Sequence, residues 1–147
     1  MYRYPIFIGK NERITIIGGI NVLQDIDEAI EIGTKFKEAC KKNKISYIFK
    51  ASFDKANRTS FDGYRGPGFR EGLEMLREIK NILKVPILTD IHETYQVSRA
   101  AEVCDMLQLP AFLARQTDLI QALANSGKPI NIKKPQFISP DQIKFIV

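Results

Sequence analysis

Four cationic side chains are grouped on one long segment that has no apolar periodicity. The segment Lys50–Gly68, KASFDKANRTSFDGYRGPG, follows an apolar run at 45–49 and carries Lys50, Lys55, Arg58 and Arg65. It is longer than a tight strand-to-helix connection needs, and long loops in compact domains are usually functional or disordered. The aromatic residues Phe53, Phe61 and Tyr64 are expected to anchor it against disorder. Cations fixed on such a loop suit an anionic, phosphorylated small molecule, although a solvated basic loop is the simpler alternative.

Polar side chains also follow three later apolar runs. Asp90 and His92 lie in TDIHE, Gln108 precedes a segment that contains Arg115, and Lys133 leads a Lys-Lys pair. An Asp and a His could transfer protons or orient a water molecule, although a lone His is more often structural. Arg115, beside a helix start, suits a ligand or a subunit contact, and Lys133 could equally be a charged strand end. No cysteine and histidine cluster has metal-ligand spacing, and no Ser-His-Asp pattern stands out.

The bulk composition predicts one ordinary globular domain. The chain has 147 residues, of which 44% are hydrophobic and 27% charged, as in typical globular proteins. No apolar run approaches the ~20 residues of a membrane span. The N-terminal residues, MYRYPIFIGKNER, lack the apolar core and cleavage site of a signal peptide. The expected location is therefore the cytoplasm, with no membrane partner.

Two further features of the composition have plain structural interpretations. The net charge of +5 permits nucleic-acid binding without demanding it. The basic run at 35–44 is interpreted as a solvated helix end whose cations complement the helix dipole. Cys40 and Cys104 are expected to be buried reduced thiols, because two cysteines do not make a disulfide framework.

Short apolar runs alternate with longer amphipathic ones along the chain. Strands are expected at 14–20, 45–51, 86–89, 104–109 and 129–133, and helices at 25–43, 68–83, 94–103, 116–125 and from 140 onward. A small hairpin, 4–8 with 13–17, is expected at the N-terminus around a polar turn. The strands are apolar and β-branched, which is typical of parallel sheets covered on both faces. The order βαβαβαβαβα therefore predicts an α/β protein.

The polar residues distinguish between two parallel α/β folds. Gly18-Gly19-Ile20-Asn21 does not match the G-x-G-x-x-G turn of a dinucleotide-binding sheet. Lys50, Asp90, Gln108 and Lys133 all lie at or just past the carboxyl ends of expected strands, the face where (βα)8 TIM barrels collect their active sites. Such a barrel needs about 250 residues. We therefore expect a single, incomplete TIM-barrel domain over 1–147, with the hairpin at 1–17 and βα units one to five at 18–147, ended by truncation or frameshift.

Five motifs together resemble a known enzyme family. KASFDKANRTS, YRGPG, TDIHE, QLPAFLARQTDL and INIKKPQFISP, in this order from about Gly18 onward, are similar to those of the 3-deoxy-D-manno-octulosonate 8-phosphate synthases. The resemblance implies a (βα)8 barrel of nearly twice this length, usually a homotetramer. It also implies a transferase that condenses the small molecules phosphoenolpyruvate and D-arabinose 5-phosphate and releases phosphate. The product of that family enters the lipopolysaccharide core of Gram-negative bacteria.

The resemblance also implies roles for individual positions. The implied phosphoenolpyruvate contacts are Lys50, Lys55, Gln108 and Lys133. The implied arabinose 5-phosphate contacts are Asn57, Arg58, Thr59 and, from a neighbouring subunit, Arg115. Asn21, Asp90 and His92 are the implied catalytic residues. Asn21 stands where the metal-dependent class of the family has cysteine, so the chain resembles the metal-free class and no cofactor is expected. Gln24 and Thr59 depart from the common glutamate and serine.

Three alternatives remain open. The related 3-deoxy-heptulosonate phosphate synthase uses erythrose 4-phosphate; the KANR loop and Asn21 argue against that enzyme. The chain could also be a non-catalytic remnant, because the family places further phosphate-binding residues on later strands; the fragment alone is expected to be inactive. A nucleic-acid binder would show salt-sensitive retention on DNA, but no recognition motif is present.

Overall fold

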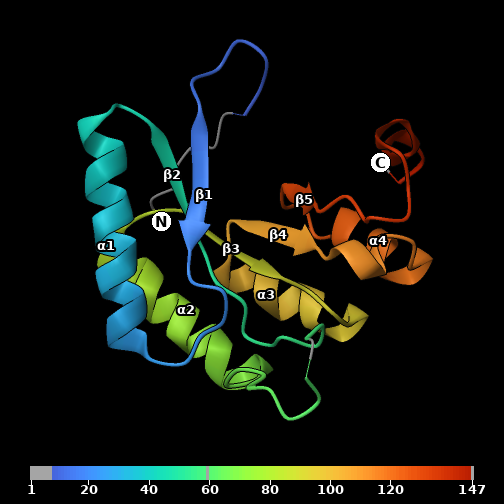
Figure 1. Ribbon diagram of the computed structural model, residues 1–147, viewed down its shortest axis with the longest axis horizontal. Coiled ribbons are helices and arrows are strands. Elements are labelled where there is room, and N and C mark those ends of the chain that lie inside the picture. The colour runs from blue at the N-terminus through green and yellow to red at the C-terminus, as the bar shows by residue number, and fades with distance from the viewer. Residues whose placement is uncertain (1–7, 59, 147) are drawn as a thin grey trace. The chain divides into compact units, whose positions relative to one another are not determined.

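The computed structural model describes residues 8–58 and 60–146, which belong to two compact units, Met1–Leu88 and Thr89–Val147. The first unit contains β1 (Thr15–Gly19), α1 (Ile26–Lys42), β2 (Ser46–Lys50), α2 (Phe69–Leu83) and the beginning of β3 (Ile87–Asp90). The second contains the end of β3, η1 (Thr94–Gln96), α3 (Val97–Val103), β4 (Met106–Leu109), η2 (Ala111–Leu113), α4 (Thr117–Ala124), β5 (Ile130–Ile132) and η3 (Pro140–Phe145). The prefix η marks a 3₁₀ helix, and Figure 1 labels the helices and strands.

The strands pair in parallel and in chain order. In the first unit Thr15 of β1 lies opposite Ser46 of β2, and Phe49 of β2 lies opposite Ile87 of β3. In the second unit Gln108 of β4 lies opposite Asn131 of β5. The strand order is β1-β2-β3-β4-β5, with a helix after each strand, as in the first five βα units of a TIM barrel. The predicted fold class is therefore confirmed.

The ends of several elements differ from the sequence-based expectation. Residues 1–7, which hold most of the first expected hairpin strand, lie outside the described residues, so the hairpin stays a prediction. Its turn is present, since the Glu12 N–H donates to the Gly9 carbonyl at 3.2 Å. Cys104, expected to open a strand, instead ends α3, and its N–H donates to the Ala100 carbonyl at 2.8 Å. Cys40 and Cys104 are buried thiols, as predicted.

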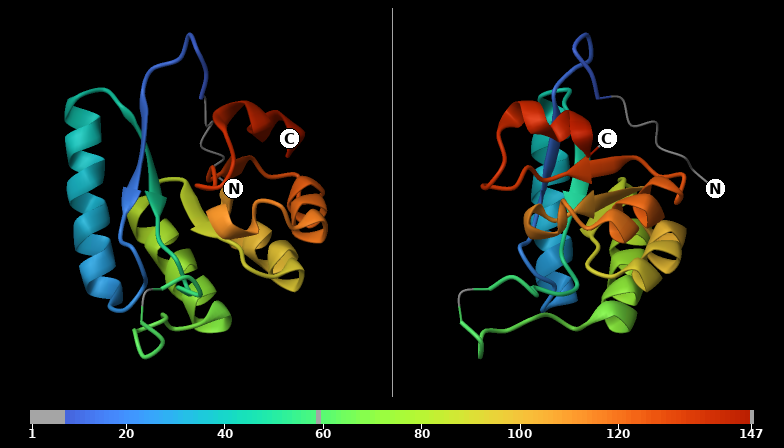
Figure 2. Two further views of the ribbon diagram at one scale, coloured as in Figure 1. Left: turned by 45° about the vertical axis from the view of Figure 1, so that its right-hand side comes forward. Right: turned by 90° about the vertical axis from the view of Figure 1, so that its right-hand side faces the viewer.

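Helices α1 and α2 pack closely in the first unit (Figures 1 and 2). Asp25 caps α1 by accepting hydrogen bonds from the N–H groups of Asp27 and Glu28, at 2.8 and 3.0 Å. Gly33 of α1 lies against Leu83 of α2 and Phe49 of β2. The buried residues around this contact are Ile48, Phe49, Leu76, Ile79 and Leu83. The helices thereby cover β2, whose last residue begins the candidate site.

The second unit has its own apolar core. Its fully buried side chains include Ile91, Leu107 and Leu109, which flank the polar residues of the strand ends. α3 and α4 add Val97, Ala100, Leu119 and Leu123. Within the described residues, no helix has the length and apolar character needed to cross a membrane.

Candidate functional site

In the first unit, the carboxyl end of β2 holds Lys50 in place. The Lys50 ammonium group donates to the Ser52 hydroxyl at 2.8 Å, and Lys50 is only partly exposed. The backbone carbonyls of both residues accept hydrogen bonds from the loop after β1, from Ile20 N–H at 3.1 Å and Leu23 N–H at 2.9 Å. Gly19 has φ +153°, and a Cβ there would overlap the Lys50 carbonyl oxygen, so this close approach needs glycine.

The long loop after β2 is closed at its base. Phe53 is fully buried, and its carbonyl accepts from Gly68 N–H at 3.1 Å. The Arg65 guanidinium group binds the Asp54 carboxylate with two hydrogen bonds, 2.8 and 2.6 Å long, and this pairing raises the pKa of Arg65. The Lys55 N–H donates to the Arg65 carbonyl at 2.6 Å. Arg65, grouped by sequence with the ligand-binding cations, is therefore a residue that closes the loop.

The tip of the loop is more exposed than its base. Arg58 donates from Nε to the Phe61 carbonyl at 3.1 Å, and its guanidinium carbon lies 5.7 Å from the centre of the Phe61 ring. Phe61 is 89% exposed, so the expectation that Phe61 anchors the loop is wrong. The Tyr64 hydroxyl reaches the Leu23 carbonyl at 3.3 Å. Asn57 is exposed beside Arg58, and Thr59 lies outside the described residues.

Asn21 is exposed on the loop between β1 and α1. Gln24, on the same loop, is also exposed. Among residues 8–58 and 60–146, no three His, Cys, Asp or Glu side chains gather as a metal site would require. The metal-free class inferred from Asn21 stays a prediction.

In the second unit, the end of β3 presents an acid–base pair. Asp90 Oδ2 lies 3.2 Å from His92 Nε2, and the two side chains are only 7% and 11% exposed. The Gln96 side-chain carbonyl accepts from His92 N–H at 2.9 Å and from Glu93 N–H at 3.1 Å, so buried Gln96 fixes the turn that carries the imidazole. The sequence reasoning missed Gln96. The Glu93–Gln96 spacing of a capping box was the available signal.

The ends of β4 and β5 are joined by a pair of amides. Asn131 Nδ2 donates to Gln108 Oε1 at 2.9 Å, and the Gln108 backbone carbonyl accepts from Ile91 N–H at 3.0 Å. Asn131 was also missed. It is a polar residue inside the short apolar run INI.

The two lysines after β5 differ in their surroundings. Lys133 is exposed, and its backbone N–H extends the pairing with β4 by donating to the Leu109 carbonyl at 3.1 Å. The Lys134 ammonium group instead donates to the carbonyls of Pro135 and Ile138, at 2.6 and 3.1 Å. Lys134 therefore holds the following turn, whereas the ligand contact expected for Lys133 stays a prediction.

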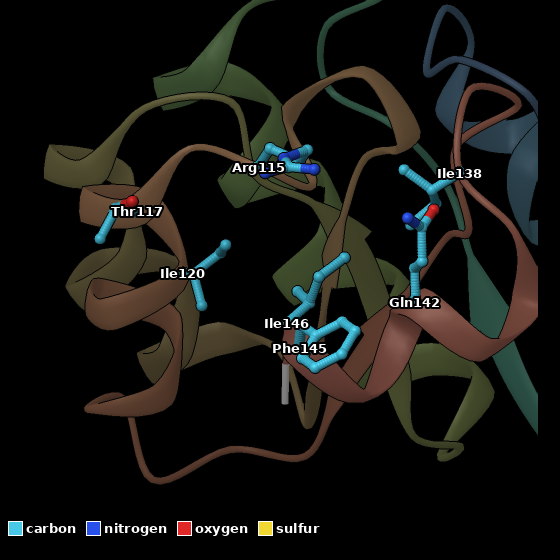
Figure 3. A pocket seen from close by; sticks show the side chains of 7 residues that line it. All are labelled: Arg115, Thr117, Ile120, Ile138, Gln142, Phe145 and Ile146. Carbon is cyan, nitrogen blue, oxygen red and sulfur yellow. The ribbon is translucent and has the colours of Figure 1, made fainter.

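Arg115 lies at a pocket of its own in the second unit. The pocket, of about 400 Å³, is lined by Arg115, Thr117, Ile120, Ile138, Gln142, Phe145 and Ile146 (Figure 3). Arg115 supplies the cation of this lining, beside the start of α4, and the other side shown in Figure 3 is largely apolar. The structure therefore places Arg115 at a pocket that it shares with residues of η3.

Parallel βα repeats with polar side chains at the carboxyl ends of the strands define a class by fold, the TIM-barrel type. Comparison with known proteins narrows this class. The sequence model of the DAHP synthetase I family matches residues 2–146, and the chain belongs to that family.

Several relatives are named 2-dehydro-3-deoxyphosphooctonate aldolase. The chain is 56% identical over 132 residues to the protein of that name from Prochlorococcus marinus, covering 90% of this chain and 47% of the relative. It is 54% identical over 140 residues to the one from Histophilus somni (95% and 49%). With the one from Shewanella amazonensis it shares 51% identity over 142 residues (97% and 50%). The chain thus spans about half the length of the relatives it matches.

Proposed function

We propose that this chain supplies substrate-binding and acid–base residues for 3-deoxy-D-manno-octulosonate 8-phosphate synthesis. The observation that carries the proposal is the name shared by relatives 51–56% identical over 90–97% of the chain, 2-dehydro-3-deoxyphosphooctonate aldolase. The geometry supports the same chemistry. A half-buried lysine ends β2, a buried Asp–His pair ends β3, and an exposed lysine follows β5.

The proposed substrates are two anions, phosphoenolpyruvate and D-arabinose 5-phosphate. Lysines bind such anions as point charges, and the planar arginine group can bind a phosphate with two hydrogen bonds. The contacts assigned to phosphoenolpyruvate are Lys50, Lys55, Gln108 and Lys133. Those assigned to the sugar phosphate are Asn57, Arg58, Thr59 and, from a neighbouring subunit, Arg115. Holding both anions in register supplies positioning and charge stabilisation.

The proposed reaction forms a carbon–carbon bond and a carbon–oxygen bond from water, and it breaks the carbon–oxygen bond to phosphate. C3 of phosphoenolpyruvate attacks the sugar aldehyde, whose oxygen takes up a proton. Water adds at C2 and loses one proton, and the resulting hydroxyl loses its second proton as phosphate leaves from C2 to give the ketone. The Asp90–His92 pair is suited to receive the proton of that water, since its atoms lie 3.2 Å apart. Asn21 is assigned to the same catalytic group, and no metal is required by this scheme.

The biological setting is part of the proposal. The proposed product would enter lipopolysaccharide synthesis, as the family resemblance implies, and the proposed location is the cytoplasm. A homo-oligomer is proposed because the role assigned to Arg115 depends on a neighbouring subunit, and the family resemblance implies that this oligomer is a tetramer.

A second candidate reaction uses erythrose 4-phosphate in place of the pentose phosphate. The family description, DAHP synthetase I, favours considering this seven-carbon synthase. The names of the relatives favour the eight-carbon product.

An aldehyde-specificity assay tests the proposal. Phosphate release from phosphoenolpyruvate is measured with each sugar phosphate. The chain is assayed alone and fused to the portion of the Histophilus somni relative that follows its matched residues. We expect the fusion to use arabinose 5-phosphate in preference to erythrose 4-phosphate, and an Asp90→Asn fusion to be strongly impaired. Preference for erythrose 4-phosphate would support the second candidate. A folded fusion that is inactive with both sugars would support the non-catalytic remnant.

A further inference from the structure

The hydrogen bond between the two side-chain amides at the ends of β4 and β5 runs in one direction, from Asn131 to Gln108. Gln108 and Asn131 lie opposite each other in the strand register, and both are partly buried. Asn131 Nδ2 is the donor and Gln108 Oε1 the acceptor, 2.9 Å apart. The Gln108 main chain is also held, because its carbonyl accepts from Ile91 N–H. Both ends of Gln108, backbone and side chain, are therefore fixed within the second unit.

This direction decides which group Gln108 can offer to a ligand. A primary amide has an acceptor at one end and two N–H donors at the other. Because Asn131 occupies the oxygen of Gln108, the Nε2 group turns the other way. Lys133 follows Asn131 by two residues, and alternate residues of an extended strand lie on one face. The N–H donor of Gln108 and the ammonium group of Lys133, at the ends of the neighbouring strands β4 and β5, together favour an anion.

We propose that Asn131 is a positioning residue, which holds the Gln108 amide so that its NH₂ group faces the phosphoenolpyruvate anion. The inference rests on the proposed function for the identity of that anion. Without Asn131, the Gln108 amide can rotate by half a turn and present its carbonyl oxygen, which repels an anion. Asn131 itself need not touch the substrate.

The first test needs no ligand. In nuclear magnetic resonance spectra of the 147-residue chain, the hydrogen-bonded Nδ2 proton of Asn131 is expected to exchange with solvent more slowly than the Nε2 protons of Gln108. In the Asn131→Asp variant the Gln108 Nε2 protons should become the protected ones, because a carboxylate only accepts hydrogen bonds and must be met by the Gln108 NH₂ group. Slow exchange of Gln108 Nε2 in the wild-type chain would overturn the proposal, since the amide would then face the other way.

The second test measures binding of phosphoenolpyruvate by calorimetry, with inorganic phosphate as a simpler probe. Loss of a hydrogen bond to a charged ligand predicts that the Kd of phosphoenolpyruvate rises about 10- to 100-fold in Asn131→Asp, and less in Asn131→Leu. The added charge of Asp is separated by a double-mutant cycle with Gln108→Met, which has no amide to turn. In the Gln108→Met background only the charge effect of Asn131→Asp should remain.

The outcomes separate this inference from the proposed function. Binding of phosphoenolpyruvate that depends on Asn131, without any turnover by the fusion, leaves the positioning role standing and sinks the synthase. Turnover with a Kd unaffected by Asn131→Asp sinks the positioning role alone. Failure of the wild-type chain to bind phosphoenolpyruvate or phosphate also overturns the role, because Gln108 would then face no anion.

Discussion

Lys133 and Lys134 are neighbours in the chain with opposite expected roles. Lys133→Ala should raise the Kd of phosphoenolpyruvate by about tenfold or more, because a charged contact is lost, with no change in the free energy of unfolding. Lys134→Ala should lower that free energy by about 1 kcal/mol, because two carbonyls lose their donor. Calorimetry measures the Kd of both variants, and urea titration measures their free energies of unfolding. Weakened binding in Lys134→Ala and not in Lys133→Ala would reverse the assignment.

The Asp90–His92 pair makes a spectroscopic prediction. His92 is the only histidine in the chain, so its imidazole gives one set of nitrogen signals in a preparation without a histidine tag. Because Nε2 faces the Asp90 carboxylate at 3.2 Å, the neutral ring should carry its proton on Nε2. Nitrogen-15 shifts of the imidazole report this tautomer. A ring protonated on Nδ1 would show that Asp90 does not orient it.

Loss of the carboxylate should also impair the reaction. General acid–base groups contribute about 10²- to 10⁴-fold to rate, so Asp90→Asn in an active fusion should lower kcat within that range. Gln96→Glu serves as the control, since a carboxylate oxygen can still accept from the N–H groups of residues 92 and 93. A normal kcat in Asp90→Asn would remove the pair from the proton transfers.

At the scale of residues, the sequence identifies which residue types lie at the strand ends, but it does not identify their hydrogen-bond partners. Lys50, Asp90 and Gln108 were found because each follows an apolar run. Arg65 and Lys134 have the same charge as the proposed ligand-binding cations, and only their contacts with Asp54 and with backbone carbonyls show that they hold loops. Gln96 and Asn131 act through hydrogen bonds to other groups, which composition and spacing do not reveal.

At the scale of elements, contact between α1 and α2 depends on a residue without a side chain. A Cβ at Gly33 would collide with Leu83 and lie 3.0 Å from a ring carbon of Phe49. Gly33→Ala should therefore destabilise the chain by about 1–3 kcal/mol from overpacking, although alanine favours helix by about 1 kcal/mol. Urea titration checks this, with exposed Glu38→Ala in the same helix as the control. A stabilised Gly33→Ala variant would contradict the close packing.

Tyr47 of β2 gives the first unit a dependence on alkaline pH. Its ring stacks on Phe36 of α1 with centres 5.7 Å apart, and its hydroxyl donates to the Gly18 carbonyl at 3.2 Å. Burial, and secondarily Cys40, raise the pKa of Tyr47 above its ordinary value of 10.0. The unfolded chain therefore releases this proton first, so its contribution to stability is complete below pH 10 and declines as pH rises above that value.

The Tyr47→Phe variant isolates this contribution. Between pH 9 and 11, the free energy of unfolding of the wild-type chain should fall more steeply than that of Tyr47→Phe, approaching a difference of about 1.4 kcal/mol per pH unit above pH 10. Exposed Tyr95→Phe is the control. Parallel slopes for the wild-type chain and Tyr47→Phe would show that Tyr47 is not protected from ionisation.

Element types were predictable because each has a strong period, whereas their ends were not. The 3.6-residue pattern of α2 and the apolar run of β2 both appear within a few residues of the expected bounds. Cys104 was placed in a strand because it is apolar, yet its N–H completes α3. The alternation of short apolar runs with longer amphipathic runs, which predicts parallel strands, is a property of many residues. The end of an element, in contrast, depends on one hydrogen bond.

At the scale of the whole molecule, the net charge of +5 leaves nucleic-acid binding as a hypothesis that the fold can test. The basic run at 35–44 is partly used in the structure. Lys35 pairs with Glu31 at 2.5 Å, and the Lys37 ammonium group donates to the Leu83 carbonyl at the end of α2, at 2.7 Å. Lys41 and Lys42 lie in the last turn of α1, where cations complement the helix dipole. These contacts favour a structural interpretation of the run over a DNA-binding face.

The prediction is that the chain does not bind DNA at physiological salt. A protein with six to ten phosphate contacts loses about 10³- to 10⁵-fold in affinity between 50 and 200 mM salt, so anisotropy of a labelled duplex is measured across that range. We expect weak DNA binding at the low end of this salt range that disappears by the high end. The Lys41→Glu/Lys42→Glu double variant should weaken this binding only as far as its lower net charge reduces the general attraction to DNA. Phosphoenolpyruvate should still bind at 200 mM salt, because its contacts are few and local. The contrary result is tight, sequence-dependent DNA binding at 200 mM salt that the double variant abolishes. It would establish the basic run as a nucleic-acid-binding face and would argue against the sugar-phosphate chemistry proposed for the strand ends.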